Sequence, residues 1–110
     1  MRRMARSYDS TQPSRDAIDA LPGATLLEFG TNWCGVCSAA QPHIERALAE
    51  APPQLRHLKV EDGPGRPLGR SFHVKLWPTL IALRDGQEVA RVVRPFSAAA
   101  IQPLLQALQR

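Results

Sequence analysis

Short apolar runs alternate along the chain with polar or Gly- and Pro-rich segments. Residues 24–29 form a mostly apolar run of strand length, which is typical of a central strand covered on both faces. Residues 55–60, 79–83 and 89–93 are also of strand type, and an Asp-Gly pair between the last two is a good hairpin-turn signal. The pattern therefore predicts a buried central strand, a second strand, and a β-hairpin.

Apolar positions near a period of 3.6 residues predict a helix over residues 34–50. Pro42 lies inside this helix and should kink it, because proline lacks the N–H that would bond to the preceding turn. A short helix is expected before the first strand, from an N-cap at Ser14 through Ala20. Another short helix is expected over residues 68–73.

Ser97 is expected to cap a final helix, although Pro103 should bend that helix or delay its start. Residues 1–13 are predicted to form a flexible or irregular arm, with a short strand near residues 5–8. Residues 14–110 are predicted to form a single domain, which suits their number. A strand–helix–strand unit followed by a hairpin predicts an α/β fold with a mixed central β-sheet flanked by helices on both faces.

Composition and charge exclude several classes of protein. The chain has 110 residues and is 44% hydrophobic, so it can build a core, yet no apolar run approaches the roughly 18 residues of a membrane span. The basic start, Met1–Arg6, is followed by polar residues rather than the apolar core of a signal peptide. The formal charge of +4 is scattered, without a nucleic-acid-binding motif. We expect a cytoplasmic protein without membrane or nucleic-acid partners.

The 2 cysteines, Cys34 and Cys37, lie at the start of the long predicted helix. A pair this close cannot join distant segments, and beside an α/β pattern it indicates redox chemistry. Side chains three apart on a helix have Cβ atoms roughly 5–6 Å apart, so small adjustments allow a disulfide. The helix N-terminus favours the thiolate form of Cys34. We predict that Cys34 is the exposed nucleophile, that Cys37 resolves the mixed disulfide, and that Gly35 lets a substrate approach closely.

Two other interpretations of the cysteine pair stay open at this point. Zinc or an iron–sulfur cluster would need further ligands, and His43, His57 and His73 do not have convincing spacing for that. We therefore predict neither a metal nor a cofactor. The cysteines could also be inert structural residues. His43 is expected on the surface, and the sequence names no partner for His57 or His73.

Several separated motifs together resemble the thioredoxin family. They are Glu28-Phe29, Trp33-Cys34-Gly35-Val36-Cys37, Pro42, Trp77-Pro78-Thr79 and Asp85-Gly86. The resemblance covers residues 14–110 and is specific because the motifs agree in order and spacing. It implies the thioredoxin fold and a monomeric thioredoxin-like protein-disulfide reductase, which reduces disulfides in target proteins by dithiol exchange and receives electrons from a reductase partner.

The resemblance also implies roles for individual residues. In that family the proline at the position of Pro78 is cis, and the adjacent backbone would pair with an extended substrate segment. The implied substrate-binding residues are Trp33, Gly35, Val36, Trp77, Pro78 and Thr79. Glu28 matches a buried acidic residue, usually Asp, that assists proton transfer at the inner cysteine. Burial should raise the pKa of Glu28, so that it accepts the proton of Cys37, directly or through water.

Three departures from the family pattern carry expectations of their own. Val36 replaces the usual proline, and its N–H should help to stabilise the Cys34 thiolate, which makes the reduction potential less negative. Trp77 is bulky, and either forms an aromatic wall with Trp33 or covers the core. Arg94 and Pro95 stand near a family glycine and should narrow the substrate range. The alternative function is a non-catalytic partner-binding or chaperone module, or a redox-sensing regulator.

Overall fold

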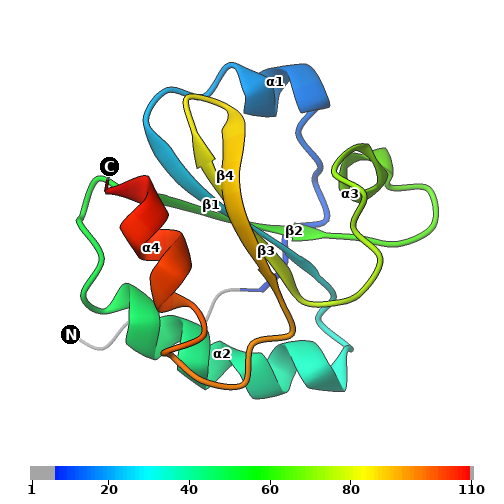
Figure 1. The fold of residues 1–110 in the computed structure, drawn as a ribbon. Coiled ribbons are helices and arrows are strands. Elements are labelled where there is room, and N and C mark those ends of the chain that lie inside the picture. Colours follow the sequence, from blue (N-terminus) through cyan, green and yellow to red (C-terminus); the bar gives the residue numbers. More distant parts are fainter. Residues whose placement is uncertain (1–6, 110) are drawn as a thin grey trace.

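The computed structural model describes residues 7–109 and contains a 4-stranded sheet in the order β2-β1-β3-β4 (Figure 1). β1 (Ala24–Gly30) pairs in parallel with β2 (Arg56–Glu61) and antiparallel to β3 (Thr79–Arg84). β4 (Gln87–Val93) pairs antiparallel to β3, which completes the expected hairpin. The mixed sheet predicted from the order of the elements is confirmed.

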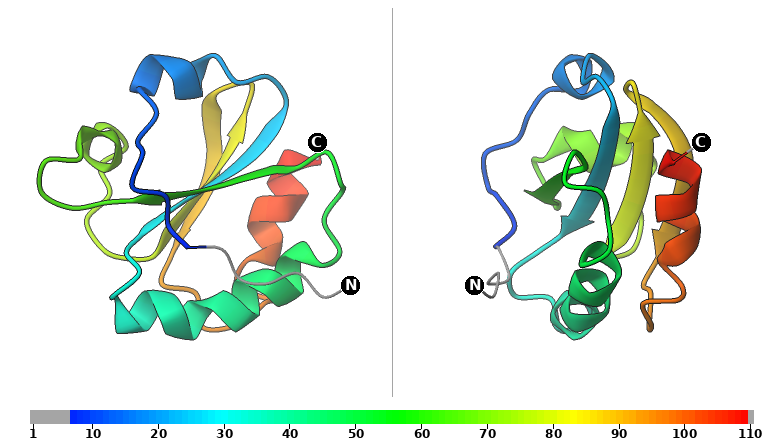
Figure 2. Two further views of the ribbon diagram at one scale, coloured as in Figure 1. Left: turned by 180° about the vertical axis from the view of Figure 1, so that it is seen from behind. Right: turned by 90° about the vertical axis from the view of Figure 1, so that its left-hand side faces the viewer.

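Helices cover both faces of this sheet (Figure 2). α2 (Gly35–Leu48) and α4 (Gln102–Leu108) share one hydrophobic cluster with β1 and β3. α1 (Arg15–Asp19) lies on the other face, where Ile18 and the α3 segment (Pro67–Ser71) pack in a second cluster. No helix within residues 7–109 is long and apolar enough to cross a membrane.

Alternation along β1 divides its side chains between the two clusters. Leu26 belongs to the cluster under α2 and α4, whereas Leu27 and Phe29 belong to the cluster under α1 and α3. Side chains two residues apart on a strand share a face, so Glu28 lies in the row of Leu26 and faces α2. The strand thereby carries a carboxyl group into the interior beneath the long helix.

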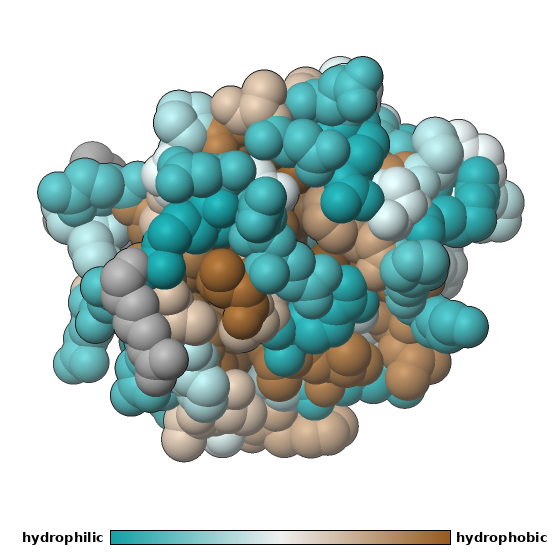
Figure 3. Space-filling view, turned by 45° about the horizontal axis from the view of Figure 1, so that its top comes forward, coloured by the Kyte–Doolittle hydropathy of each residue, from teal (hydrophilic) through white to brown (hydrophobic). Residues whose placement is uncertain are grey.

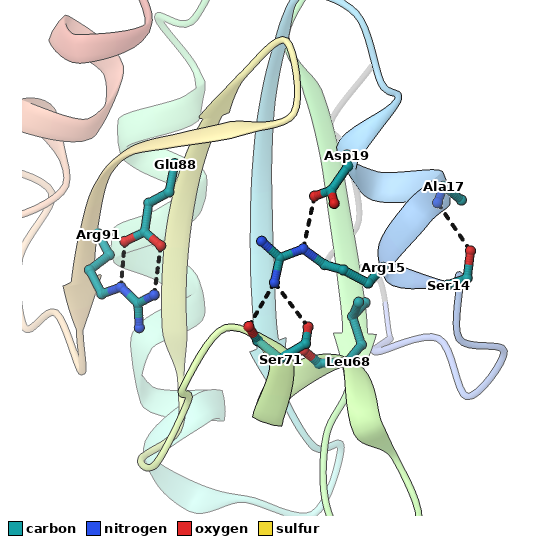
Figure 4. Close-up of polar contacts among 8 residues, drawn as sticks. All are labelled: Ser14, Arg15, Ala17, Asp19, Leu68, Ser71, Glu88 and Arg91. Carbon is teal, nitrogen blue, oxygen red and sulfur yellow. Dashed lines mark hydrogen bonds and ion pairs between the residues drawn. The ribbon is translucent and has the colours of Figure 1, made fainter.

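Side-chain contacts fix α1 where the sequence predicted it. The Ser14 hydroxyl accepts a 3.0 Å hydrogen bond from the Ala17 N–H, which confirms Ser14 as the N-cap (Figure 4). Arg15 joins α1 to α3, because its Nη1 donates to the Ser71 carbonyl at 2.6 Å. Its guanidinium carbon also lies 3.8 Å from the centroid of the Phe72 ring.

The final helix begins later than expected. The Ser97 hydroxyl accepts a 3.1 Å bond from the Ala100 N–H, but α4 starts only at Gln102, with Ile101 as its N-cap. The prediction that Ser97 caps this helix is therefore wrong. Pro103 lies in the first turn of α4, where its missing N–H costs no helical bond, and the prediction that it delays the helix is confirmed.

The described part of the N-terminal arm is attached to β2. The Asp9 N–H donates to the Lys59 carbonyl at 2.8 Å, and the Glu61 N–H donates to the Asp9 carbonyl at 3.0 Å. Tyr8 is only 5% exposed. Of the strand expected near residues 5–8, residues 5 and 6 lie outside the described residues, and residues 7 and 8 are not in a strand. An isolated bridge forms instead at Asp9, opposite Val60.

Candidate active site

Cys34 lies at the point where β1 has ended and α2 begins. Its backbone is extended, with φ −88° and ψ 116°, and its sulfur accepts a 3.2 Å hydrogen bond from the Cys37 N–H. The sulfur thus occupies the position that an oxygen takes at most helix N-caps. Cys34 is partly exposed, Cys37 is 1% exposed, and both are free thiols. The predicted arrangement, with one sulfur at the helix tip and the other a turn deeper, is confirmed.

Ionisation of the Cys37 thiol is strongly unfavourable. Burial, followed by the hydrogen bond and charge of Cys34, raises the pKa of Cys37 to about 12, although contacts to Thr31 and Tyr8 act in the opposite direction. Cys37 therefore keeps its proton at neutral pH. Because the thiolate is the nucleophile in disulfide exchange, an attack by Cys37 requires a group that removes this proton.

Glu28 is the carboxyl group that the family resemblance implies for removing the proton of Cys37. Its side chain is fully buried. Its Oε1 lies 2.9 Å from His57 Nε2. Its Oε2 accepts hydrogen bonds from the Tyr8 hydroxyl and, at 2.9 Å, from Gln41 Nε2. β1, β2, α2 and the N-terminal arm all contribute to this cluster. Both carboxylate oxygens are thus engaged by other side chains.

The predicted increase in the pKa of Glu28 is wrong. Burial does act to raise this pKa, but hydrogen bonds from His57, Tyr8 and Gln41 and the charge of Lys59 outweigh it, and the pKa is lowered. Lys59 is itself 6% exposed and donates a 2.8 Å bond to Gln41 Oε1. Glu28 is therefore a hydrogen-bonded carboxylate rather than a neutral acid.

Sequence reasoning missed Tyr8, Gln41 and the partner of His57. His57, for which the sequence names no partner, lies within hydrogen-bond distance of Glu28. β1 and β2 pair with Glu28 opposite Lys59 and Leu26 opposite His57, so both β2 side chains share the face of Glu28. The alternation of polar residues at positions 57 and 59 indicates that His57 and Lys59 share one face of β2. Only the strand register shows that this is the face of Glu28.

The expected features beside the cysteines are present. The Trp77–Pro78 bond is cis, as predicted. Trp77 forms an edge-to-face pair with Trp33, with ring centroids 5.6 Å apart, and Trp33 is 76% exposed. The aromatic wall was therefore the correct one of the two alternatives for Trp77. Thr79 is buried, and its hydroxyl donates a 2.6 Å bond to the Leu76 carbonyl.

Arg94 donates hydrogen bonds to the carbonyl groups of both residues that form the cis bond. Its N–H donates a 2.9 Å bond to the Pro78 carbonyl, and its Nε donates a 2.8 Å bond to the Trp77 carbonyl. Its φ of 51° lies in the left-handed region that favours glycine, which agrees with its place near a family glycine. The side chain of Arg94 therefore occupies the Trp77 carbonyl next to the cis bond.

The remaining candidates lie around the helix start or away from it. Gly35 is exposed, and an added Cβ would meet nothing within 4 Å, whereas Val36 is partly buried. His43 was expected on the surface, but it is partly buried, and its Nδ1 is buried without a hydrogen-bond partner among the described residues. His73 is exposed. Within residues 7–109, no group of three or more His, Cys, Asp or Glu could hold a metal ion.

The molecular surface is mixed in character. Large hydrophobic side chains are exposed at Trp33, Leu76 and Phe96, with exposed fractions of 76%, 50% and 77%. On the face seen in Figure 3, polar and charged residues predominate and apolar residues show between them in small groups. The exposed hydrophobic side chains thus include that of Trp33, the residue directly before Cys34.

A mixed sheet of this topology, a dithiol at the start of α2 and a cis-proline after α3 define the thioredoxin-like thiol–disulfide oxidoreductases. The sequence model of the thioredoxin family matches residues 11–107. The chain belongs to the thioredoxin family.

Individual relatives agree with this assignment. The thioredoxin of Mycobacterium tuberculosis is 34% identical over 76 residues, which cover 69% of this chain and 66% of that protein. The thioredoxin of Chlamydia trachomatis is 42% identical over 72 residues, which cover 64% of this chain and 69% of that protein. The structure of reduced thioredoxin 2 from Pseudomonas aeruginosa has 56% identity and a TM-score of 0.84, with 96% of each chain covered.

Proposed function

We propose that the chain is a protein-disulfide reductase that acts on disulfides of target proteins by dithiol exchange. The observation that carries the proposal is the arrangement of the two thiols: Cys34 is partly exposed and caps α2, and Cys37 is buried one turn further on. An accessible nucleophile next to a protected second thiol is what a two-step exchange requires.

In the first step, the Cys34 thiolate attacks one sulfur of the target disulfide. The target S–S bond breaks, a mixed disulfide forms, and the other target sulfur leaves as a thiolate that takes a proton from water. In the second step, Cys37 loses its proton and attacks Cys34. The mixed disulfide breaks, the Cys34–Cys37 disulfide forms, and the target leaves with both sulfurs reduced. Two electrons pass to the target.

The proposed contacts with the target come from residues around Cys34. Trp33 and Trp77 offer an aromatic wall, and Gly35 leaves open space beside the nucleophile. Thr79 is the first residue of β3 and Pro78 directly precedes it, and Val36 lies in the first turn of α2. Because Arg94 engages the Trp77 carbonyl, we propose a narrower range of targets than a freely accessible backbone would allow.

The partners we propose follow from the same chemistry. The oxidised cysteine pair has to be reduced before another turnover, so a reductase supplies the electrons; the chain itself uses neither an organic cofactor nor a metal. The proposed setting is the cytoplasm, where disulfides are mostly transient. We propose a monomer without nucleic-acid or membrane partners.

Insulin reduction in the presence of a small dithiol tests the proposal. The unmodified protein should accelerate precipitation of reduced insulin, Cys34→Ser should abolish the effect, and Ser38→Ala, an exposed neighbour on α2, should not change it. Cys37→Ser should hold insulin covalently through Cys34. An unmodified protein that gives only the background rate of the dithiol contradicts the proposal. Partner binding that survives without both thiols would indicate the non-catalytic binding module instead.

A further inference from the structure

Tyr8 brings a hydroxyl group to the resolving thiol from outside the predicted domain. A Cβ added to Gly30 would lie 2.8 Å from both the Tyr8 hydroxyl oxygen and the Cys37 sulfur, so these two atoms converge over that glycine. The Tyr8 hydroxyl and the Cys37 thiol are thus neighbours, and the contact with Tyr8 acts to lower the pKa of Cys37. Gly30 thus leaves the space in which Tyr8 reaches Cys37.

The direction of the hydrogen bonds around Tyr8 follows from its partners. An ionised carboxylate can only accept, so the single hydroxyl hydrogen of Tyr8 is donated to Glu28 Oε2. The lone pairs of the Tyr8 oxygen face Gln41 Nε2, which donates to it at 3.2 Å, and the thiol of Cys37, which lies beside the hydroxyl over Gly30. The Tyr8 hydroxyl therefore lies between the Cys37 thiol and the Glu28 carboxylate, to which it is hydrogen-bonded.

From this arrangement we infer that Tyr8 transfers the proton of Cys37 to Glu28 when Cys37 resolves the mixed disulfide. The inference rests on the proposed function. As the Cys37 sulfur bonds to Cys34, its proton passes to the Tyr8 oxygen, and the original Tyr8 proton passes to Glu28 Oε2. The bond between Cys34 and the target breaks in the same step, and the target sulfur leaves with the electron pair. Tyr8 ends the step as a neutral phenol.

The surroundings of Tyr8 suit a residue that passes a proton without becoming charged. Burial, followed by the charge and hydrogen bond of Glu28, raises the pKa of Tyr8 far above its usual range, so a free phenolate does not form. The groups that face it are Glu28 from β1, Gln41 and Cys37 from α2, and Lys59 from β2, whose Nζ lies 4.6 Å from the centroid of the Tyr8 ring. His57, bonded to the other oxygen of Glu28 and 12% exposed at its side chain, connects the cluster to the surface.

Stopped-flow reaction with 5,5′-dithiobis(2-nitrobenzoate) separates the two exchange steps. Attack by Cys34 releases a first equivalent of coloured thiolate and leaves a mixed disulfide, and attack by Cys37 releases the second. Tyr8→Phe keeps the buried ring and removes only the hydroxyl. It should slow the second release on the order of 100-fold, the lower range for general acid–base catalysis, and leave the first unchanged. Thr25→Val is the matched control, because it removes a different buried hydroxyl, which accepts a bond from Arg56 and lies on the face of β1 opposite Glu28.

Two further measurements distinguish proton transfer from a structural effect. Without the relay, Cys37 depends on hydroxide, so the second release in Tyr8→Phe should rise about tenfold per pH unit between pH 6 and 9, more steeply than in the unmodified protein. Glu28→Gln should slow the second release similarly, and the double variant should be no slower than either single one. In the unmodified protein, D₂O should slow the second release more than the first.

The outcomes separate the two proposals. A protein that never releases the second equivalent refutes the proposed reductase. If both equivalents are released, but Tyr8→Phe matches the unmodified protein in rate and in pH dependence, then the relay is wrong while the reductase stands. Additive losses in the double variant, or an equal D₂O effect on both releases, would also overturn the relay.

Discussion

The indole nitrogen of Trp77 donates a 2.9 Å hydrogen bond to Oδ2 of Asp62, which follows β2. This bond orients the inner ring of the Trp33–Trp77 pair. The carboxylate of Asp62 has room because residue 69 of α3 is a glycine: a Cβ there would lie 2.3 Å from Asp62 Oδ1. A backbone position in α3 thus controls an aromatic side chain next to the dithiol.

Gly69→Ala should therefore displace Asp62 and release the Trp77 indole. We expect about 1–3 kcal/mol of lost stability from overpacking, and a higher KM for insulin without a change in the reaction of Cys34 with a small disulfide. Asp62→Ala should raise the KM in the same way, and the double variant should raise it no further. Urea unfolding and steady-state kinetics measure these effects; an unchanged KM in Gly69→Ala would show that the Trp77 bond does not matter for target binding.

Arg94→Ala should widen the range of targets. The variant frees the Trp77 carbonyl, which now accepts a 2.8 Å bond from Arg94 Nε, for pairing with an extended target segment. We expect kcat/KM to increase for several unrelated disulfide proteins, by roughly fivefold to tenfold if one hydrogen bond of about 1–1.5 kcal/mol is gained. Arg91→Ala, which removes an arginine of β4 three residues earlier, serves as the control. A uniform loss of activity in Arg94→Ala would mean that Arg94 helps to bind targets.

Glu28→Gln should make stability less sensitive to acid. The pKa of Glu28 in the folded chain lies below its ordinary value of 4.5, so the unfolded chain binds this proton first as the pH falls. The stabilisation by ionised Glu28 is therefore complete above about pH 4.5 and is lost as the pH falls through the lowered folded pKa. At pH 7 we expect Glu28→Gln to lose about 1–3 kcal/mol.

Urea unfolding at pH 7 and at pH 3 tests this prediction. The difference between the unmodified protein and Glu28→Gln should shrink at the lower pH. Asp16→Asn provides the comparison, since this exposed carboxyl lies in the first turn of α1 and belongs to no such cluster. An equal difference at both values of pH would mean that the surrounding hydrogen bonds do not favour the ionised form of Glu28.

Val36→Pro should make the reduction potential more negative. Proline removes the N–H of residue 36 at the positive end of α2 and leaves the observed bond from the Cys37 N–H to the Cys34 sulfur in place. One charge-assisted hydrogen bond contributes about 1.5–3 kcal/mol, which corresponds to roughly 30–60 mV for a two-electron couple. Equilibration with glutathione buffers measures the potential, and a potential that is unchanged or less negative contradicts the prediction.

Local signals in the sequence were sufficient for most of the framework. The apolar run at residues 24–29, the N-cap at Ser14 and the Asp-Gly turn each act within a few residues, so they could be recognised before any packing was known. The cysteine pair could be predicted in the same way, from the spacing of Cys34 and Cys37. The cis bond before Pro78 could also be predicted, but through the family resemblance. Where two local signals competed, as for Ser97 and Pro103, the pattern did not decide which would define the helix start.

Only the tertiary structure decided whether the buried side chain of Glu28 is ionised. The direction of the pKa shift of Glu28 depends on Tyr8, Gln41, His57 and Lys59, which come from the arm, α2 and β2. Burial was visible in the sequence, and by itself it raises a carboxyl pKa. The opposing hydrogen bonds depend on strand register and on where the arm crosses, and such contacts between distant residues leave no periodic pattern along the chain.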